Sequence, residues 1–133
     1  GLLGYREATT DASGDGYELH VEYPQITRGG VPTRWAATIT RSDGGPLPAV
    51  TLRMTTAHLE LFDHNGVQPT PSDTWQTPEW TTWDFDAAGE TALNVILDMR
   101  TQPNVRWRHP ARVELLVEDR TVAAVDYHTT VLP

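Results

Sequence analysis

The stretch YELHVEY, residues 17–23, alternates apolar and polar residues one by one. Successive side chains of a β-strand point to opposite faces, so this period of two predicts a strand with one buried and one solvated face. Pro24 follows directly. Because proline has no backbone N–H to give to a neighbouring strand, we expect the strand to end there.

The same alternation recurs along most of the chain, in the runs TRWAATITR (33–41), AVTLRMTT (49–56), TTWDFDA (81–87), TALNVILDM (91–99), ARVELLVED (111–119) and TVAAVDYHTTV (121–131). Ten prolines and ten glycines punctuate the chain at roughly strand-length intervals. Helix signals are nearly absent, and at most one short helical turn is expected, near residues 56–62.

Seven to eight short strands with one buried face each predict an all-β fold, an antiparallel β-sandwich of the immunoglobulin-like or fibronectin-like kind. A closed barrel is the alternative, and the irregular lengths of the connections favour the sandwich. The expected core residues are Tyr17, Leu19, Val21, Trp35, Ile39, Leu52, Trp83, Phe85, Leu93, Val95 and Leu97.

Size and composition fit one domain. The chain has 133 residues, of which 38% are hydrophobic, enough for a single core. We expect a β-sandwich domain over residues 15–133 and a flexible N-terminal segment over residues 1–14. That segment is either the remnant after a removed signal or anchor helix or an ordinary frayed terminus. No run approaches the ~20 apolar residues of a membrane span.

The charge balance limits the class of partner. Eighteen acidic and ten basic residues give a formal net charge of −8, which repels phosphate backbones, so no nucleic-acid partner is expected. Unassisted docking on anionic lipid is disfavoured for the same reason, which leaves an N-terminal anchor as the expected route to a membrane. The chain has no cysteine, which excludes a disulfide framework, a zinc–thiolate site and a thiol nucleophile.

The segments LELFDHNGVQPTPS (59–72), WDFD (83–86) and VDYHTTVLP (125–133) are similar to small uncharacterised actinobacterial envelope proteins. These proteins carry an N-terminal membrane anchor and an extracytoplasmic immunoglobulin-like sandwich. The resemblance covers about residues 17–133 and implies an extracytoplasmic location, anchored or secreted. It supplies no functional residues for this chain.

No metal or other cofactor is expected. The segment Asp63-His64-Asn65-Gly66 resembles the start of a calcium loop, but the required glycine and the glutamate at position 12 are absent. A turn is therefore favoured over an irregular cation site built from Asp63, Asn65 and Asp73. The five histidines show no compact ligand spacing. A copper or zinc site would need His20 and His128 to converge from neighbouring first and last strands, and a solvated surface is favoured.

Catalysis is not expected. None of the serines lies in a Gly-x-Ser-x-Gly nucleophile elbow. Carboxylates two apart on one strand face, such as Asp84 and Asp86, usually serve solubility or protect a sheet edge. A glycosidase would need a deep cleft around such a pair, and a sandwich of this size rarely supplies one.

Aromatic residues outside the expected core are the strongest candidates for a binding surface. Trp80 and Trp83 fall on opposite faces of one strand, so Trp83, in phase with Phe85, belongs to the core. The candidate contact residues are Trp75, Trp80, Trp107, Arg106 and Arg108.

We therefore expect a non-catalytic interaction or structural module of an envelope protein, with a protein or a cell-wall glycan as partner. A homodimer through edge strands is a further expectation. Whether Trp75 is exposed best separates these two kinds of partner. A shallow groove with Trp75 or Trp80 as its floor would favour a sugar, and an exposed edge strand or flat patch would favour a protein.

Overall fold

The computed structural model describes residues 4–133 and is almost entirely β-structure, as the alternation predicts. Its strands are β1 (Arg6–Gly14), β2 (Tyr17–Arg28), β3 (Pro32–Arg41), β4 (Val50–Thr55), β5 (Phe62–Gln68), β6 (Asp73–Gln76), β7 (Trp80–Phe85), β8 (Ala92–Thr101), β9 (Trp107–Val117) and β10 (Arg120–Leu132). The helical turn expected near residues 56–62 is α1 (Thr56–Leu59).

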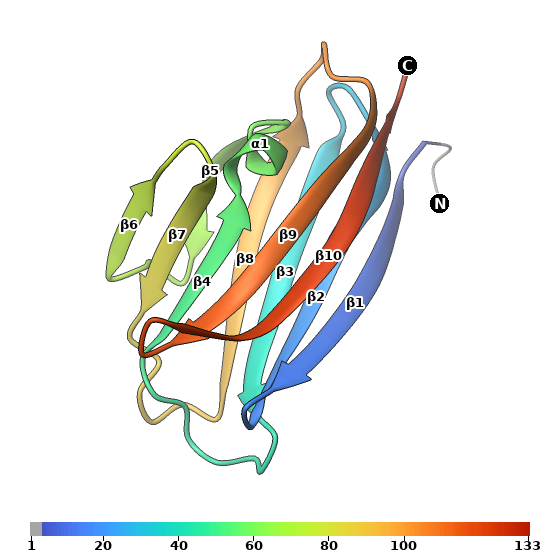
Figure 1. Ribbon diagram of the computed structural model, residues 1–133. Coiled ribbons are helices and arrows are strands. Elements are labelled where there is room, and N and C mark those ends of the chain that lie inside the picture. Colours follow the sequence, from blue (N-terminus) through green and yellow to red (C-terminus); the bar gives the residue numbers. More distant parts are fainter. Residues whose placement is uncertain (1–3) are drawn as a thin grey trace.

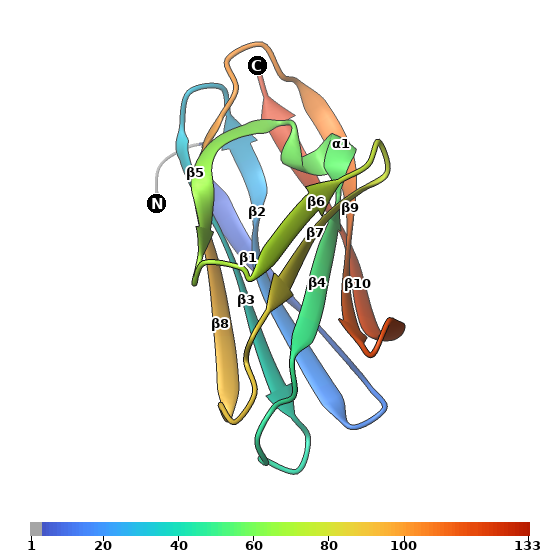
Figure 2. The same ribbon diagram turned by 90° about the vertical axis from the view of Figure 1, so that its left-hand side faces the viewer.

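The strands follow the order β5-β8-β3-β2-β10-β9-β4-β7-β6, and the sheet curls into two facing layers (Figures 1 and 2). One layer contains β5, β8, β3 and β2, and the other contains β10, β9, β4, β7 and β6. The layers join where β2 runs parallel to β10, with Ile26 opposite Thr130. Every other strand pair is antiparallel, and this arrangement is an immunoglobulin-like sandwich.

The described chain has ten strands, more than the seven to eight expected, because Arg6–Gly14, Phe62–Gln68 and Asp73–Gln76 also pair. The turn favoured at Asp63–Gly66 is wrong, since these residues belong to β5, whose pairing with β8 shifts register between His64 and Val67. The expectation of a flexible N-terminal segment is wrong for Arg6–Gly14, which pairs along β2 from Ile26 to Tyr17. Residues 1–3 lie outside the described residues. β5 and β6 are the other two additions, and they form the outer edges of the two layers.

Pro24 does not end its strand. β2 continues to Arg28, because the pairing of β2 with β3 is already complete at Glu22 and no N–H of residue 24 is needed there. The pairing with β1 shifts register beside Pro24, as expected where one strand changes its partner. The proline therefore marks the place where β2 leaves one layer and joins the other.

The predicted core is confirmed at ten of its eleven positions, which are buried: Leu19, Val21, Trp35, Ile39, Leu52, Trp83, Phe85, Leu93, Val95 and Leu97. Tyr17 is only partly buried and packs against the edge of the core. Leu59, Leu61 and Phe62 close one end of the sandwich beside α1.

Trp35 and Tyr127 tie the layers together inside the core. The Trp35 Nε1–H donates to the Tyr127 hydroxyl over 3.0 Å, and burial raises the pKa of that hydroxyl further above its usual value. The Tyr127 ring stacks on Tyr23 with centroids 4.0 Å apart, and the His58 ring meets its edge at 5.3 Å. This aromatic cluster joins α1, β2, β3 and β10.

Three buried threonines form a second polar contact inside the fold. The Thr101 hydroxyl lies 2.9 Å from both the Thr27 and the Thr33 hydroxyls, and Thr33 also donates to the Val31 carbonyl. These hydrogen bonds connect β2, β3 and β8 at the end of the sandwich where β2 changes layers. Buried hydroxyls that lose a partner keep their desolvation cost, so each member of the group supports the others.

Thr101→Val is therefore expected to lower the free energy of unfolding by about 1–3 kcal/mol, because it leaves two buried hydroxyls short of a partner. Thr9→Val makes the same chemical change at an exposed position of β1 and serves as the control. Chemical denaturation measures both variants. Equal effects for the two would show that the buried hydroxyl group contributes nothing specific.

Candidate functional site

The five tryptophans divide into buried and exposed groups, as strand parity predicts for Trp80 and Trp83. Trp35 and Trp83 are 1% and 2% exposed and belong to the core. Trp75 is 45% exposed, Trp107 is 72% exposed, and Trp80 is partly exposed. The sequence left the placement of Trp75 open, and the structure puts it outside the core.

Trp75 and Trp80 share the outer face of the β6-β7-β4 layer. The hairpin between β6 and β7 closes with the Thr77 N–H donating to the Trp80 carbonyl over 2.8 Å. Its register sets Trp75 opposite Thr82, two residues along β7 from Trp80. Side chains at such diagonal positions lie within reach of each other on one face. We call Trp75, Trp80 and the neighbouring Arg53 the tryptophan surface.

Arg53 lies on β4 with its guanidinium carbon 4.3 Å from the centre of the Trp80 ring, a cation–π contact. The same guanidinium donates two hydrogen bonds to Glu114 Oε1, over 2.9 Å from Nε and 2.5 Å from Nη2. These bonds fix the guanidinium plane against the ring. The alternation in residues 49–56 sets Arg53 on the face opposite the buried Leu52 and Met54, but its two partners come from strands far apart in the chain.

The Glu114 carboxylate is the centre of this network. It also accepts hydrogen bonds from Arg112 Nε over 2.8 Å and from Thr121 Oγ1 over 3.2 Å, and Arg112 binds Asp126 over 2.7 Å. Burial alone would raise the pKa of Glu114, but the hydrogen bonds and charges of Arg112 and Arg53 outweigh it and lower the pKa. The carboxylate is therefore held ionised beneath two arginines.

The other candidate residues lie apart from the tryptophan surface. β4 sets Thr55 opposite Trp80, and the Arg112 N–H donates to the Thr55 hydroxyl, so Trp80 is level with Arg112 on β9. Trp107 lies five residues before Arg112 on the same strand. The Arg106 guanidinium donates hydrogen bonds to the Pro103 and Val105 carbonyls. The structure therefore does not bring Trp107, Arg106 and Arg108 together with Trp75 and Trp80.

The carboxylates considered for a cation site are engaged locally. Asp73 Oδ1 accepts the Thr74 N–H over 2.9 Å, and Asp63 Oδ1 accepts a long bond of 3.4 Å from the Gln102 amide. Within residues 4–133, no group of three or more His, Asp or Glu side chains is arranged to hold a metal ion.

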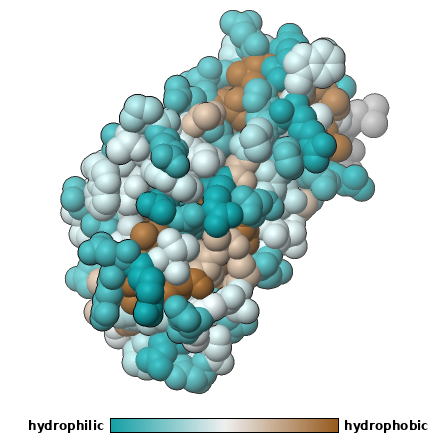
Figure 3. Space-filling view, viewed as in Figure 1, coloured by the Kyte–Doolittle hydropathy of each residue, from teal (hydrophilic) through white to brown (hydrophobic). Residues whose placement is uncertain are grey.

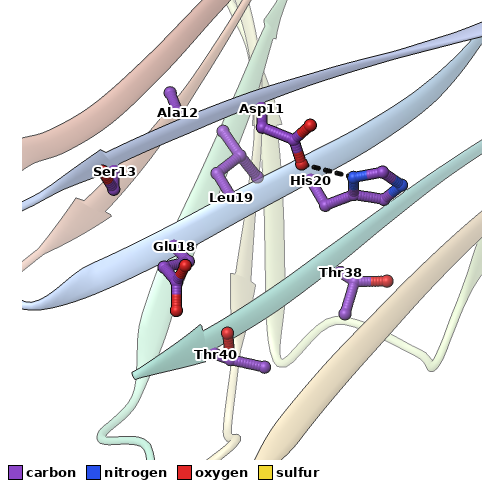
Figure 4. Close-up of a pocket in the computed structure, with 8 residues that line it drawn as sticks. All are labelled: Asp11, Ala12, Ser13, Glu18, Leu19, His20, Thr38 and Thr40. Atoms are coloured by element: carbon purple, nitrogen blue, oxygen red, sulfur yellow. Dashed lines mark hydrogen bonds and ion pairs between the residues drawn. The ribbon is translucent and has the colours of Figure 1, made fainter. Parts of the chain in front are cut away.

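His20 and His128 do not converge. β2 and β10 pair only from Ile26 onward, six residues beyond His20. His20 Nδ1 instead lies 2.5 Å from Asp11 Oδ1 across the β1–β2 pair, in a polar groove of ≈ 300 Å³ (Figure 4). Thr38 and Glu18 line the same groove.

The molecular surface agrees with separate small contact areas. Figure 3 shows a surface dominated by hydrophilic and intermediate residues, with hydrophobic residues gathered in separate spots.

Within residues 4–133, no helix is long and apolar enough to cross a membrane.

Comparison with known proteins gives little further information. No family model and no curated protein matches the chain. One similar solved structure is a GH20 exo-β-N-acetylglucosaminidase from Vibrio harveyi in complex with N-acetylglucosamine, at 12% identity and a TM-score of 0.38. The match covers 98% of this chain but 18% of the enzyme chain. A likeness this distant carries no argument about activity or ligand.

Proposed function

We propose that the chain is a non-catalytic binding module of an envelope protein and that it contacts a protein partner through the tryptophan surface. One observation carries the proposal: Trp75 leaves 45% of its side chain exposed on an edge strand, beside Trp80 and Arg53. Tryptophan and arginine are the residues most enriched among those that dominate protein interfaces.

The guanidinium of the tryptophan surface is held in place before a partner binds. Arg53 is held by Glu114 and by the Trp80 ring, so its guanidinium is already ordered before a partner arrives. Side chains that are ordered in advance cost less to immobilise on binding. The layer beneath is anchored by Trp83 in the core.

The face of the sheet, and not its edge, is the favoured contact. β6 has four residues and lies between Pro71 and Pro78, which limits any added strand. The Asp73 carboxylate also accepts the hydrogen bond of the Thr74 N–H, so this N–H is not available to an added strand. The edge-strand homodimer stays a prediction, and size-exclusion chromatography at several protein concentrations tests it.

A cell-wall glycan is the second candidate partner, because exposed tryptophan rings with polar neighbours also stack on sugars. The exposed Trp75 and Trp107 favour this candidate. Against it, Arg53 already covers one face of the Trp80 ring, which reduces the aromatic area open to a sugar. The extracytoplasmic location is also part of the proposal, and it is supported by the sequence resemblance given above.

Trp75→Ala is expected to weaken binding to the partner at least about tenfold, which corresponds to about 1.4 kcal/mol. The purified domain is used to capture proteins from a detergent extract of the source organism's envelope. Affinity for the recovered protein is then measured by calorimetry. Trp107→Ala, which removes a more exposed tryptophan elsewhere, is the matched control and should change the affinity less than twofold.

The same variants are tested against soluble cell-wall oligosaccharides. Trp75-dependent binding to an oligosaccharide, without a protein partner, would replace the protein proposal with the glycan one. Equal loss in Trp75→Ala and Trp107→Ala, or no loss in either, would show that the tryptophan surface is not the contact area.

A further inference from the structure

The junction between the two layers contains a second groove, distant from Trp75 and different in charge. It has a volume of ≈ 570 Å³ and lies among β1, β2, β9 and β10. Its lining residues are Arg6, Tyr23, Gln25, Ile26, Arg108, Tyr127, His128 and Thr130.

The groove gathers basic side chains in an otherwise acidic protein. Arg6 lies opposite Ile26, Ile26 opposite Thr130, and Thr130 opposite Arg108, so the register sets the two arginines at the ends of one row across four strands, and both line the groove. His128 lies two residues from Thr130 on the same strand. The lining contains no Asp or Glu, whereas the whole chain has a formal charge of −8.

The arginines of the groove have no carboxylate partner. Among residues 4–133, the ion pairs involve other arginines, and neither Arg6 nor Arg108 takes part in one. Carboxylates close in sequence are already bound: Glu7 accepts the Tyr5 hydroxyl, and Asp126 binds Arg112. Two guanidinium groups without a carboxylate partner leave local positive charge in the groove, and this charge attracts an anion.

We propose that this groove binds a small ligand through an oxyanion group, either phosphate or carboxylate. A guanidinium presents paired N–H donors that match the oxygens of both groups. The Thr130 hydroxyl and the His128 ring add further polar partners in the same lining. The partly buried Tyr23 ring, which stacks on Tyr127, offers an aromatic wall for the rest of the ligand.

The ligand is small and not a polyanion. Two arginines neutralise one or two anionic groups, and the overall negative charge opposes the approach of a long phosphate chain. This site is independent of the tryptophan surface, since none of Trp75, Trp80 and Arg53 lines it.

The test is a titration of the isotope-labelled protein with inorganic phosphate, followed by amide chemical shifts, at ionic strength held constant with chloride. Saturable shifts are expected for the amides of Arg6, Tyr23, Arg108 and Thr130. Glucose 6-phosphate and glucuronate serve as additional probes. The probe that binds more tightly, glucose 6-phosphate or glucuronate, identifies phosphate or carboxylate as the preferred group. If that probe also binds more tightly than inorganic phosphate, the aromatic wall contributes to binding.

Arg6→Met and Arg108→Met are each expected to weaken phosphate binding about tenfold, because each removes a charge-assisted contact. Arg120→Met makes the same charge change at an exposed residue of the β9–β10 hairpin and should change affinity less than twofold. Circular dichroism confirms that the variants are folded. Trp75→Ala should bind phosphate normally, so failure at one site is distinguishable from failure at the other.

The proposal is overturned if none of the three probes gives saturable shifts, or if the shifts spread over all exposed arginines. It is also overturned if Arg120→Met weakens binding as much as Arg108→Met. Either result would show that the anions only screen the surface charge of the protein.

Discussion

Trp35→Ala is expected to lower the free energy of unfolding by about 3–5 kcal/mol, the range for removing a buried tryptophan from a core. The side chain is 1% exposed and donates its indole N–H to Tyr127. Its loss leaves a cavity between the layers and removes the partner of a buried hydroxyl. Chemical denaturation followed by far-ultraviolet circular dichroism measures the change without relying on tryptophan fluorescence.

Two further variants separate the causes of that loss. Trp35→Phe keeps most of the apolar volume but removes the hydrogen bond to Tyr127, and it is expected to cost about 1–3 kcal/mol. Trp107→Ala removes an exposed tryptophan and should stay within about 0.5 kcal/mol of the parent. A loss as small for Trp35→Ala as for Trp107→Ala would contradict the packing of Trp35 between the layers.

The second large effect is a pH dependence of stability that originates in His58. Burial, together with the positive charges of His109 and His128, lowers the pKa of His58 to about 3. The ring is packed between Phe62 and Tyr127, and its Nδ1 has no hydrogen-bond partner among the described residues. The folded protein therefore keeps this histidine neutral in mildly acidic solution.

The sign follows from proton uptake. Below about pH 6.5 the unfolded chain protonates this histidine while the folded chain does not, so lowering the pH favours unfolding. Stability from this residue is complete above pH 6.5 and is lost as the pH falls toward 3. The slope approaches about 1.4 kcal/mol per pH unit below pH 6.5, and the loss between pH 6.5 and pH 4.5 is about 2 kcal/mol.

His58→Gln should abolish most of this slope, because glutamine does not titrate. His64→Gln, at an exposed position of β5, should retain it. Denaturation midpoints for the parent and both variants, measured at several values between pH 6.5 and pH 4.5, decide the matter. A parent slope close to zero, or one that persists in His58→Gln, would show that another group is responsible.

Much of the fold follows from local pattern alone. The alternation in residues 17–23 and 91–99 identifies the buried faces, because one register satisfies every apolar position of a half-buried strand. Parity also separated Trp80 from Trp83, and the structure confirms that Trp83 is buried.

The segments that sequence missed lack that pattern. β1 contains no large apolar residue, so its sequence shows no buried face. It forms a strand because it pairs with β2 in the folded protein. β6 is exposed at all four positions and shows no buried face. Strand pairing at such edges is decided by tertiary contacts, which a single sequence does not display.

The candidate sites were partly predictable for the same reason. The outward direction of Arg53 follows from strand parity, whereas the exposure of Trp75 is known only from the structure. The stack of Arg53 on Trp80, and the presence of Arg6 and Arg108 in one groove, require the order of the strands. These two arginines, 102 positions apart in sequence, line the same groove because β2 and β10 pair between their strands.

The proposed contact of the tryptophan surface is tested most directly by hydroxyl-radical footprinting of the protein with and without an extract of the source organism's envelope. Binding through this surface predicts lower oxidation of Trp75 and Trp80 in the extract, with unchanged oxidation of Trp107. Protection of Trp107 alone, or equal oxidation of all three with and without extract, would contradict the proposed function.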